Sequence, residues 1–155
     1  MSTPQPTARA PATPEDWRRY YRLRWRLLRA PWGQPPGSER DALEGCSVHR
    51  MVCDTEGGVL AVGRVHDAGR HTAQIRYMAV ETAHQRRGLG TLILAELERA
   101  ASGWGKTTII LHAREGAAPF YRRRGYTVVG RSHLLFGEIR HYLMAKQLTS
   151  AGGKD

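Results

Sequence analysis

A basic turn at residues 85–90 combines the features that an anion-binding site needs. The hexapeptide QRRGLG follows an apolar segment, residues 75–80, that is typical of a strand, and precedes residues 91–100, which are typical of a helix. Glycines let backbone N–H groups approach a ligand closely, and the N–H groups of a first helical turn have no partner within the helix. The helix dipole and two arginines add positive charge. The sequence therefore predicts that this turn binds an anion, and a pyrophosphate fits it best.

Two common phosphate-binding motifs are absent from this turn. The P-loop pattern requires GxxxxGK followed by Ser or Thr, and the dinucleotide pattern requires GxGxxG, of which only Gly88 and Gly90 are present. The motif that is present in this turn is Q-x-x-G-x-G, directly after the expected strand. On this motif the sequence resembles the GNAT superfamily of acyl-CoA N-acyltransferases, whose signature Gln/Arg-x-x-Gly-x-Gly/Ala clasps the pyrophosphate of coenzyme A. The alternative is a basic surface turn that merely caps a helix, and a second matching segment speaks against it.

That second segment, residues 111–126, is similar to the other motif of the family. The family pattern is a strand followed by N-x-x-A-x-x-F-Y-x-x-x-G-F/Y, and this sequence matches it at Ala117, Phe120, Tyr121, Gly125 and Tyr126. The family's Asn is Arg114 here, which could reach a phosphate or the acceptor. The resemblance extends over residues 7–148, and residues 20–41 and 136–144 look like one branch of uncharacterised bacterial members.

The resemblance implies how the cofactor, acetyl-CoA, would be held. In the family fold a bulge parts the central strand from the next one, and the acyl-pantetheine enters the gap as if it were another strand. Backbone groups of Met78 and Val80 would then hold the pantetheine. The cofactor-binding residues implied in this way are Met78, Ala79, Val80, Gln85, Arg86, Arg87, Gly88, Leu89, Gly90, Thr91, Arg114, Ala117 and Phe120.

Tyr121 is predicted to be the general acid. The resemblance implies that a hydroxyl at this motif position lies near the cofactor sulfur. A phenol with an ordinary pKa of about 10 keeps its proton at neutral pH, and its pKa is close to that of an alkyl thiol. Proton transfer to the leaving thiolate would then be nearly balanced. The alternative is a tyrosine that only packs in the core or caps a short helix.

The general base is less clearly marked. Some members of the family carry a Glu on the central strand, where this sequence has Gln74, and Gln cannot take up a proton. Glu138 and His141 are the predicted catalytic pair, because both belong to the C-terminal pattern of the uncharacterised branch. His66 and Glu81 are further candidates, although a single His or Glu is more often an ordinary surface group.

Two residues are predicted to bind the acceptor. Arg76 lies within the expected central strand, where a cation is costly unless it is paired. It would therefore pair with Glu138 or another acid, or bind a carboxylate on the acceptor. Trp32 lies in a loop, residues 31–38, whose three prolines restrict it. This loop could form a wall of the acceptor site or a lid over the sheet edge, and the resemblance favours the acceptor site.

The pattern of elements predicts a single α/β domain with the GNAT fold, over residues 7–148. We expect a mixed, mostly antiparallel sheet of six to seven strands flanked by helices, and disordered tails at residues 1–6 and 149–155. The expected strands are residues 7–10, 48–54, 59–65, 73–80, 107–111, 126–130 and 139–146. The expected helices begin at Thr13, at residue 91 and at Ala117, and end before Pro31, at residue 101 and at residue 124.

Charge and composition limit the classes of partner that we expect for this chain. The net charge is +10, but no nucleic-acid-binding motif accompanies it, so a basic nucleic-acid-binding protein of this fold is disfavoured. No run of about 18 apolar residues indicates a membrane span, and the N-terminus lacks the pattern of a secretory signal. Cys46 and Cys53 predict reduced, buried thiols without metal-ligand spacing. We therefore expect a cytoplasmic protein without a metal, and a homodimer is one possible assembly.

The sequence thus predicts an acetyl-CoA-dependent N-acetyltransferase. Its acceptor would be a primary amine of a small molecule or a peptide, and the sequence does not identify it. The alternative is a catalytically weak module of the same fold that binds coenzyme A as a sensor. Gln74 and Arg114, which depart from the family pattern, keep that alternative open.

Overall fold

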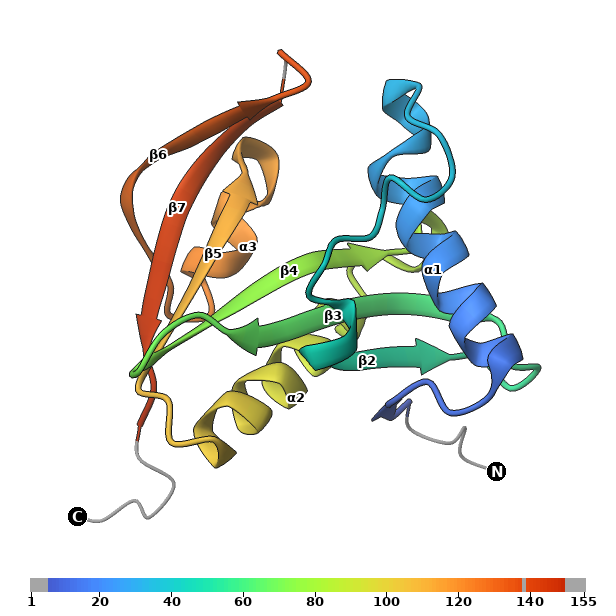
Figure 1. Cartoon of the computed structure of the whole chain (residues 1–155), viewed down its shortest axis with the longest axis horizontal. Helices are drawn as coiled ribbons and strands as arrows, with labels where there is room; N and C mark the ends of the chain where they lie inside the picture. Colours follow the sequence, from blue (N-terminus) through green and yellow to red (C-terminus); the bar gives the residue numbers. More distant parts are fainter. Residues whose placement is uncertain (1–5, 138, 150–155) are drawn as a thin grey trace.

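The computed structural model describes residues 6–137 and 139–149, and these form an α/β domain (Figure 1). The strands are β1 Ala8–Arg9, β2 Val48–Cys53, β3 Val59–Asp67, β4 Thr72–Val80, β5 Thr108–Arg114, β6 Thr127–Leu135 and β7 Ile139–Gln147. The helices are α1 Pro14–Leu28, α2 Leu89–Gly103 and α3 Ala118–Arg122. Short 3₁₀ turns are η1 Ala30–Trp32, η2 Glu44–Cys46, η3 Thr82–His84 and η4 Glu115–Ala117.

All seven described strands form one sheet in the order β1-β2-β3-β4-β5-β7-β6. Among these strands only β4 and β5 run parallel, and the other neighbours are antiparallel. The predicted mixed and mostly antiparallel sheet is therefore confirmed.

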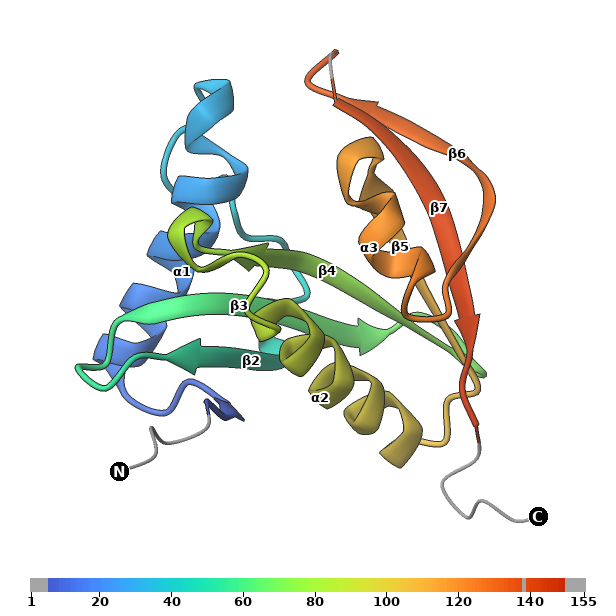
Figure 2. The ribbon, with the colours of Figure 1, turned by 180° about the vertical axis from the view of Figure 1, so that it is seen from behind.

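The two long helices cover opposite faces of the sheet. Helix α1 lies in front of β3 and β4 in Figure 1, and the reverse view in Figure 2 brings α2 to the front. On α2, Ile93, Leu94 and Leu97 are buried in the larger apolar core. On α1, Tyr20 and Leu23 are buried in a second core with Met51, Val62 and Ala79.

The predicted start of α1 is confirmed by its cap. The Thr13 hydroxyl accepts a hydrogen bond from the Asp16 backbone N–H at 3.0 Å, and the Asp16 carboxylate accepts one from the Thr13 N–H at 3.2 Å. This reciprocal capping box satisfies two N–H groups that the helix itself leaves free. Pro14 occupies the first helical position, where its missing N–H costs nothing.

Some sequence-based boundaries were too short. Strand β5 continues past residue 111 to Arg114, and β6 continues past residue 130 to Leu135. The added part of β6 is mostly exposed at the sheet edge, so it lacks the apolar alternation that marks a half-buried strand. The expectation of buried thiols was also wrong, because Cys46 is exposed and Cys53 is only partly buried.

A bulge in β4 breaks the sheet next to the parallel strand pair. On β3 the partners of Val62 and Arg64 are Ala79 and Arg76, so Gly63 faces two residues of β4. Tyr77, one of these two, has a φ of 59°, which is rare for a residue with a side chain. The pairing of β4 with β5 stops at Ile75, just before the bulge. Beyond it the two strands no longer share hydrogen bonds, and that part of the β4 edge is free.

Candidate active site

The basic turn predicted to bind pyrophosphate has the backbone of an anion site. Gly88 is the N-cap of α2, with a φ of 79° and no side chain that could cap the helix. Arg86 also has a positive φ, 68°. Left-handed residues of this kind are typical of turns whose backbone N–H groups bind an anion, and the first N–H groups of a helix have no partner within the helix. The Gln85 side-chain amide donates a hydrogen bond to the Val80 carbonyl at 3.3 Å, which ties the turn to the end of β4.

A cavity of about 870 Å³ leads from this turn along the free edge of β4. We call it the cofactor cavity after the residues that the sequence predicted to bind the cofactor. Twelve of the thirteen residues predicted to bind the cofactor line it, whereas Arg87 does not. The lining includes Met78, Ala79, Val80, Gln85, Arg86, Gly88, Leu89, Gly90, Thr91, Arg114, Ala117 and Phe120. Trp32, predicted to bind the acceptor, also lines this cavity.

A second cavity of about 390 Å³ lies between β4 and the histidine-bearing ends of β5, β6 and β7. We call it the acceptor cavity because it contains Arg76, which the sequence predicted to bind the acceptor. Arg76 and His141, both predicted from the sequence, line it, as does Gln74. Five residues line both cavities, so the two cavities meet where β4 and β5 part. These shared residues are Leu28, Met78, Arg114, Ala117 and Tyr121.

Residues 17–126 match the sequence profile of the Acetyltransferase (GNAT) family. This chain belongs to the GNAT family. The uncharacterized N-acetyltransferase YjcF of Bacillus subtilis (strain 168) is 35% identical over 112 residues, which are 72% of this chain and 79% of that protein. The chain is therefore an acetyltransferase, and the GNAT fold uses acetyl-CoA.

Solved structures show the same fold. An aminoglycoside 6′-N-acetyltransferase complexed with coenzyme A superposes with a TM-score of 0.76 at 16% identity, over 90% of this chain and 96% of that one. The ribosomal-protein-S18-alanine N-acetyltransferase of Escherichia coli superposes with a TM-score of 0.71 at 18% identity, over 97% and 99%. These two enzymes are named for very different acceptors, so the fold by itself does not identify the acceptor of this GNAT protein.

Tyr121 lies at the junction of the two cavities of this GNAT domain. It is held by α3 and packs its ring edge against Phe120 and Tyr126, with centroids 5.0 and 5.7 Å apart. The side chain is 8% exposed, and burial raises the pKa of its phenol. No described residue forms a hydrogen bond with its hydroxyl. The Tyr121 hydroxyl therefore keeps its proton and is free to donate it to a ligand.

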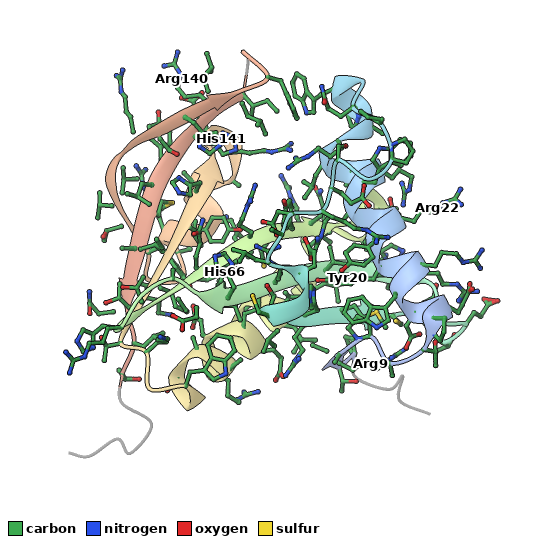
Figure 3. The ribbon with its side chains drawn as sticks, viewed as in Figure 1. Arg9, Tyr20, Arg22, His66, Arg140 and His141 are labelled. Carbon is green, nitrogen blue, oxygen red and sulfur yellow. The ribbon has the colours of Figure 1, made fainter. Side chains whose placement is uncertain are left out.

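His141 faces the acceptor cavity from β7, as the cross-strand partner of Arg114 on β5 (Figure 3). Its Nδ1 lies 2.9 Å from the Ile139 carbonyl oxygen, which can only accept, so Nδ1 carries the proton. The lone pair of the neutral ring is then on Nε2. Burial lowers the pKa of His141, and the positive charge of neighbours such as Arg114 lowers it further. The ring is therefore neutral at pH 7 and able to accept a proton.

The other predicted bases are placed less favourably. His66 lies on β3 with its Nδ1 3.1 Å from Arg64, and Glu81 is bound by Arg26. Neither lines the acceptor cavity. Glu138, the predicted partner of His141, lies outside the described residues.

Arg76 is paired with an acid, as we expected from the sequence, and that acid is Asp41. Its guanidinium lies 2.9 Å from the Asp41 carboxylate, which also binds the buried Arg64 at 2.7 Å. Burial alone would raise the pKa of Asp41, but hydrogen bonds from Arg64 and from the Leu43 backbone, with the charges of Arg64 and Arg76, lower it to about 2. Asp41 therefore ties residues 39–44 to β3 and β4 beside the acceptor cavity.

One arginine and two histidines of the acceptor cavity were not predicted as site residues. Arg29 follows the last residue of α1, and His112 and His133 come from β5 and β6. The rings of His133 and His141 stack with centroids 4.4 Å apart, and the His112 and His133 centroids are 5.3 Å apart. The three histidines come from three different strands, so only the strand order β5-β7-β6 could have revealed this row.

Within residues 6–137 and 139–149, no group of three or more His, Cys, Asp or Glu side chains is placed to hold a metal ion. In the same part of the chain no helix has both the length and the apolar character that a membrane crossing requires.

Proposed function

We propose that this protein transfers the acetyl group of acetyl-CoA directly to a primary amine of a small molecule or a peptide. The observation that carries the proposal is the junction of the two cavities at Met78, Arg114 and Tyr121. A thioester that follows the free edge of β4 from the basic turn reaches this junction. An amine in the acceptor cavity then meets it there, and holding two reactants together supplies much of the rate.

His141 in the acceptor cavity and Tyr121 at the junction supply the proton transfers. His141 Nε2 takes a proton from the amine as the amine attacks the thioester carbonyl. Tyr121 donates its proton to the thiolate as the carbon–sulfur bond breaks. Burial raises the pKa of the phenol, and the same environment disfavours the thiolate, so the balance between the two remains close.

The alternative, a sensor that binds coenzyme A without turnover, rests on Gln74. This residue lines the acceptor cavity at the place where some family members carry a carboxylate base. The sensor would bind acetyl-CoA but release no coenzyme A when amines are added.

The experiment is a screen of acetyl-CoA turnover against amines, amino acids, polyamines, antibiotics and peptides, with release of the free thiol as the readout. Acceptor-dependent release in the wild type, lost in Gly88→Val together with acetyl-CoA binding, supports the transferase. Saturable binding of acetyl-CoA without any acceptor-dependent release across the panel would favour the sensor.

A further inference from the structure

The described charged side chains that line the acceptor cavity are all basic. Three arginines, Arg29, Arg76 and Arg114, line it together with the histidine row, and no Asp or Glu among the described residues does so. Arg76 is paired with Asp41 at 2.9 Å, a carboxylate that it shares with Arg64. The other two arginines, Arg29 and Arg114, have no acidic partner among the described residues.

These two arginines meet at one atom. The Arg29 Nη1 donates to the Leu28 carbonyl oxygen at 3.1 Å, and the Arg114 Nη2 donates to the same oxygen at 3.3 Å. Arg29 also donates through Nε to the Ser38 carbonyl at 3.1 Å. The guanidiniums of Arg29, just after α1, and of Arg114, on β5, are thus held side by side on backbone carbonyls at the end of a helix, where the partial charge is negative but small.

Elsewhere this fold gives its buried arginines a carboxylate. Arg24 and Arg64 are fully buried, and Glu44 binds both at 2.9 Å. Arg29 is 8% exposed, yet among the described residues no carboxylate lies within 4.0 Å of Arg29 or Arg114. The guanidinium of Arg29 also lies over the rings of Tyr77 and Phe136, with its central carbon 5.6 Å from each ring centroid.

This arrangement is electrostatically unfavourable for both arginines. Burial lowers the pKa of Arg29 and of Arg114, and the charge of Arg29 lowers that of Arg114 further. Arginine does not lose its proton in proteins, so both remain charged and repel each other. An anion placed between them would satisfy both forks, because a guanidinium binds carboxylate or phosphate oxygens in pairs.

Building on the proposed transferase, we infer that the acceptor is a small amine that also carries a carboxylate or phosphate group, and that Arg29 and Arg114 bind this group. The cavity of about 390 Å³ fits a small molecule. Polyamines and aminoglycosides keep further ammonium groups after one amine has lost its proton. Those groups would face arginines without a compensating acid from the described lining.

The test compares acceptors that differ only in the anionic group. The pairs are β-alanine with β-alaninamide and phosphoethanolamine with ethanolamine, and spermidine and kanamycin serve as cationic acceptors. We expect kcat/KM for the anionic member to be about 10- to 100-fold higher in at least one pair, as hydrogen bonds to charged groups allow. The pair with the larger ratio distinguishes carboxylate from phosphate. The inference is overturned, and the transferase left intact, if the uncharged member is used as well as or better than the anionic one in both pairs, or if the polycations are used better than every anionic acceptor.

Matched variants locate the effect. Arg29→Gln should raise KM for the anionic acceptor about 10-fold, with KM for its uncharged partner nearly unchanged. Because Arg114 also lines the cofactor cavity, Arg114→Gln is judged by the ratio of kcat/KM between the anionic acceptor and its uncharged partner, which should fall about 10-fold whatever the variant does to acetyl-CoA. Arg22→Gln removes the same charge from the outer side of α1, where the side chain points away from the sheet, and should change neither KM (Figure 3). Melting temperatures show whether each variant folds. If Arg29→Gln does not fold, Arg114→Gln still tests the inference, because Arg114 is only half-buried.

A binding experiment separates this inference from the proposed reaction. Calorimetry on the wild type saturated with coenzyme A compares N-acetyl-β-alanine and N-acetylphosphoethanolamine with N-acetyl-β-alaninamide, and needs no turnover. Tighter binding of either anionic product, weakened in Arg114→Gln but not in Arg22→Gln, supports the anion site even if the transferase assay fails. Binding of both anionic products no tighter than that of the amide overturns it.

Discussion

Tyr77 on β4 and Gly63 on β3 lie opposite each other where the two strands lose register, and this pair opens the edge that forms both cavities. A Cβ on Gly63 would lie 2.6 Å from Ile93 Cγ2 on α2 and 2.9 Å from Met78 Sδ. The glycine therefore lets the bulge and α2 approach closely. Because Met78 lines both cavities, the packing under the bulge is coupled to the site.

Gly63→Ala should destabilise the fold by about 1–3 kcal/mol, the usual cost of forcing an extra carbon into a packed core. It should also weaken acetyl-CoA binding, because Met78 has to move. Urea unfolding and calorimetry measure the two effects. Gly45→Ala is the control, since a Cβ there meets no atom within 4 Å. Unchanged stability and affinity in Gly63→Ala would show that the bulge tolerates a side chain.

Gly88→Val should abolish acetyl-CoA binding. The space around a Cβ on Gly88 is open in the structure, and that space is where we place the pyrophosphate. The positive φ of 79° also strains any substitution, so the control must carry the same strain. Gly105→Val does so, with a φ of 82° and equally open surroundings just beyond the other end of α2. Calorimetry should show binding lost only in Gly88→Val, and equal affinities in the two variants would remove the turn from the cofactor site.

Asp41→Asn should lower the free energy of unfolding by about 2 kcal/mol at pH 7, because the buried Arg64 loses its bidentate partner. The pKa of Asp41 is lowered to about 2 in the fold, against about 3.9 in an unfolded chain. Its contribution is thus complete above about pH 4 and is lost as the pH falls toward 2. The stability difference between wild type and variant should close over that interval.

Asp67→Asn is the matched control for this effect. It removes the same charge from an exposed carboxylate that binds Lys106 at 2.8 Å, and surface ion pairs contribute little. Denaturant titrations at several pH values measure both variants. A pH-independent gap for Asp41→Asn would mean that its packing, and not its charge, stabilises residues 39–44.

The turn between β4 and α2 and the placement of Tyr121 on a short helix could be predicted because each lies in one short stretch of sequence whose spacing carries the signal. The start of α1 could be predicted for the same reason, because the capping residues Thr13 and Asp16 are three positions apart in the sequence. The acceptor cavity could not be predicted in this way. Arg29 and Arg114 meet although 85 positions separate them, and the histidine row depends on β7 lying between β5 and β6. Such contacts follow from strand order, which a single sequence does not encode locally.

His141→Gln should lower kcat/KM and flatten the acidic limb of its pH profile. In the wild type, burial holds the pKa of His141 below its usual value near 6.5, so activity should fall only as the pH drops below that value. Glu138→Gln, measured in parallel, distinguishes between the two predicted bases. The exposed His71→Gln is the control. If the acidic limb persists in His141→Gln and disappears in Glu138→Gln, the base is Glu138.

Tyr121→Phe tests the general acid, and Tyr126→Phe is its structural counterpart. Phe keeps the ring at position 121 and removes only a hydroxyl that no described residue binds, so acetyl-CoA affinity and melting temperature should stay nearly unchanged. The leaving thiolate loses its proton donor, and kcat should fall by roughly 10²-fold. The loss should shrink at low pH, where solvent can supply the proton.

Tyr126 is 1% exposed, and its hydroxyl donates to Glu98 at 2.8 Å, so Tyr126→Phe removes a buried hydrogen bond away from both cavities. It should lower the melting temperature and leave kcat intact, the opposite pattern to Tyr121→Phe. Steady-state kinetics across pH and thermal melts on both variants give the comparison. If kcat of Tyr121→Phe equals that of the wild type at every pH, the proton for the thiolate comes from another group, and Tyr121 serves only to close the junction of the two cavities.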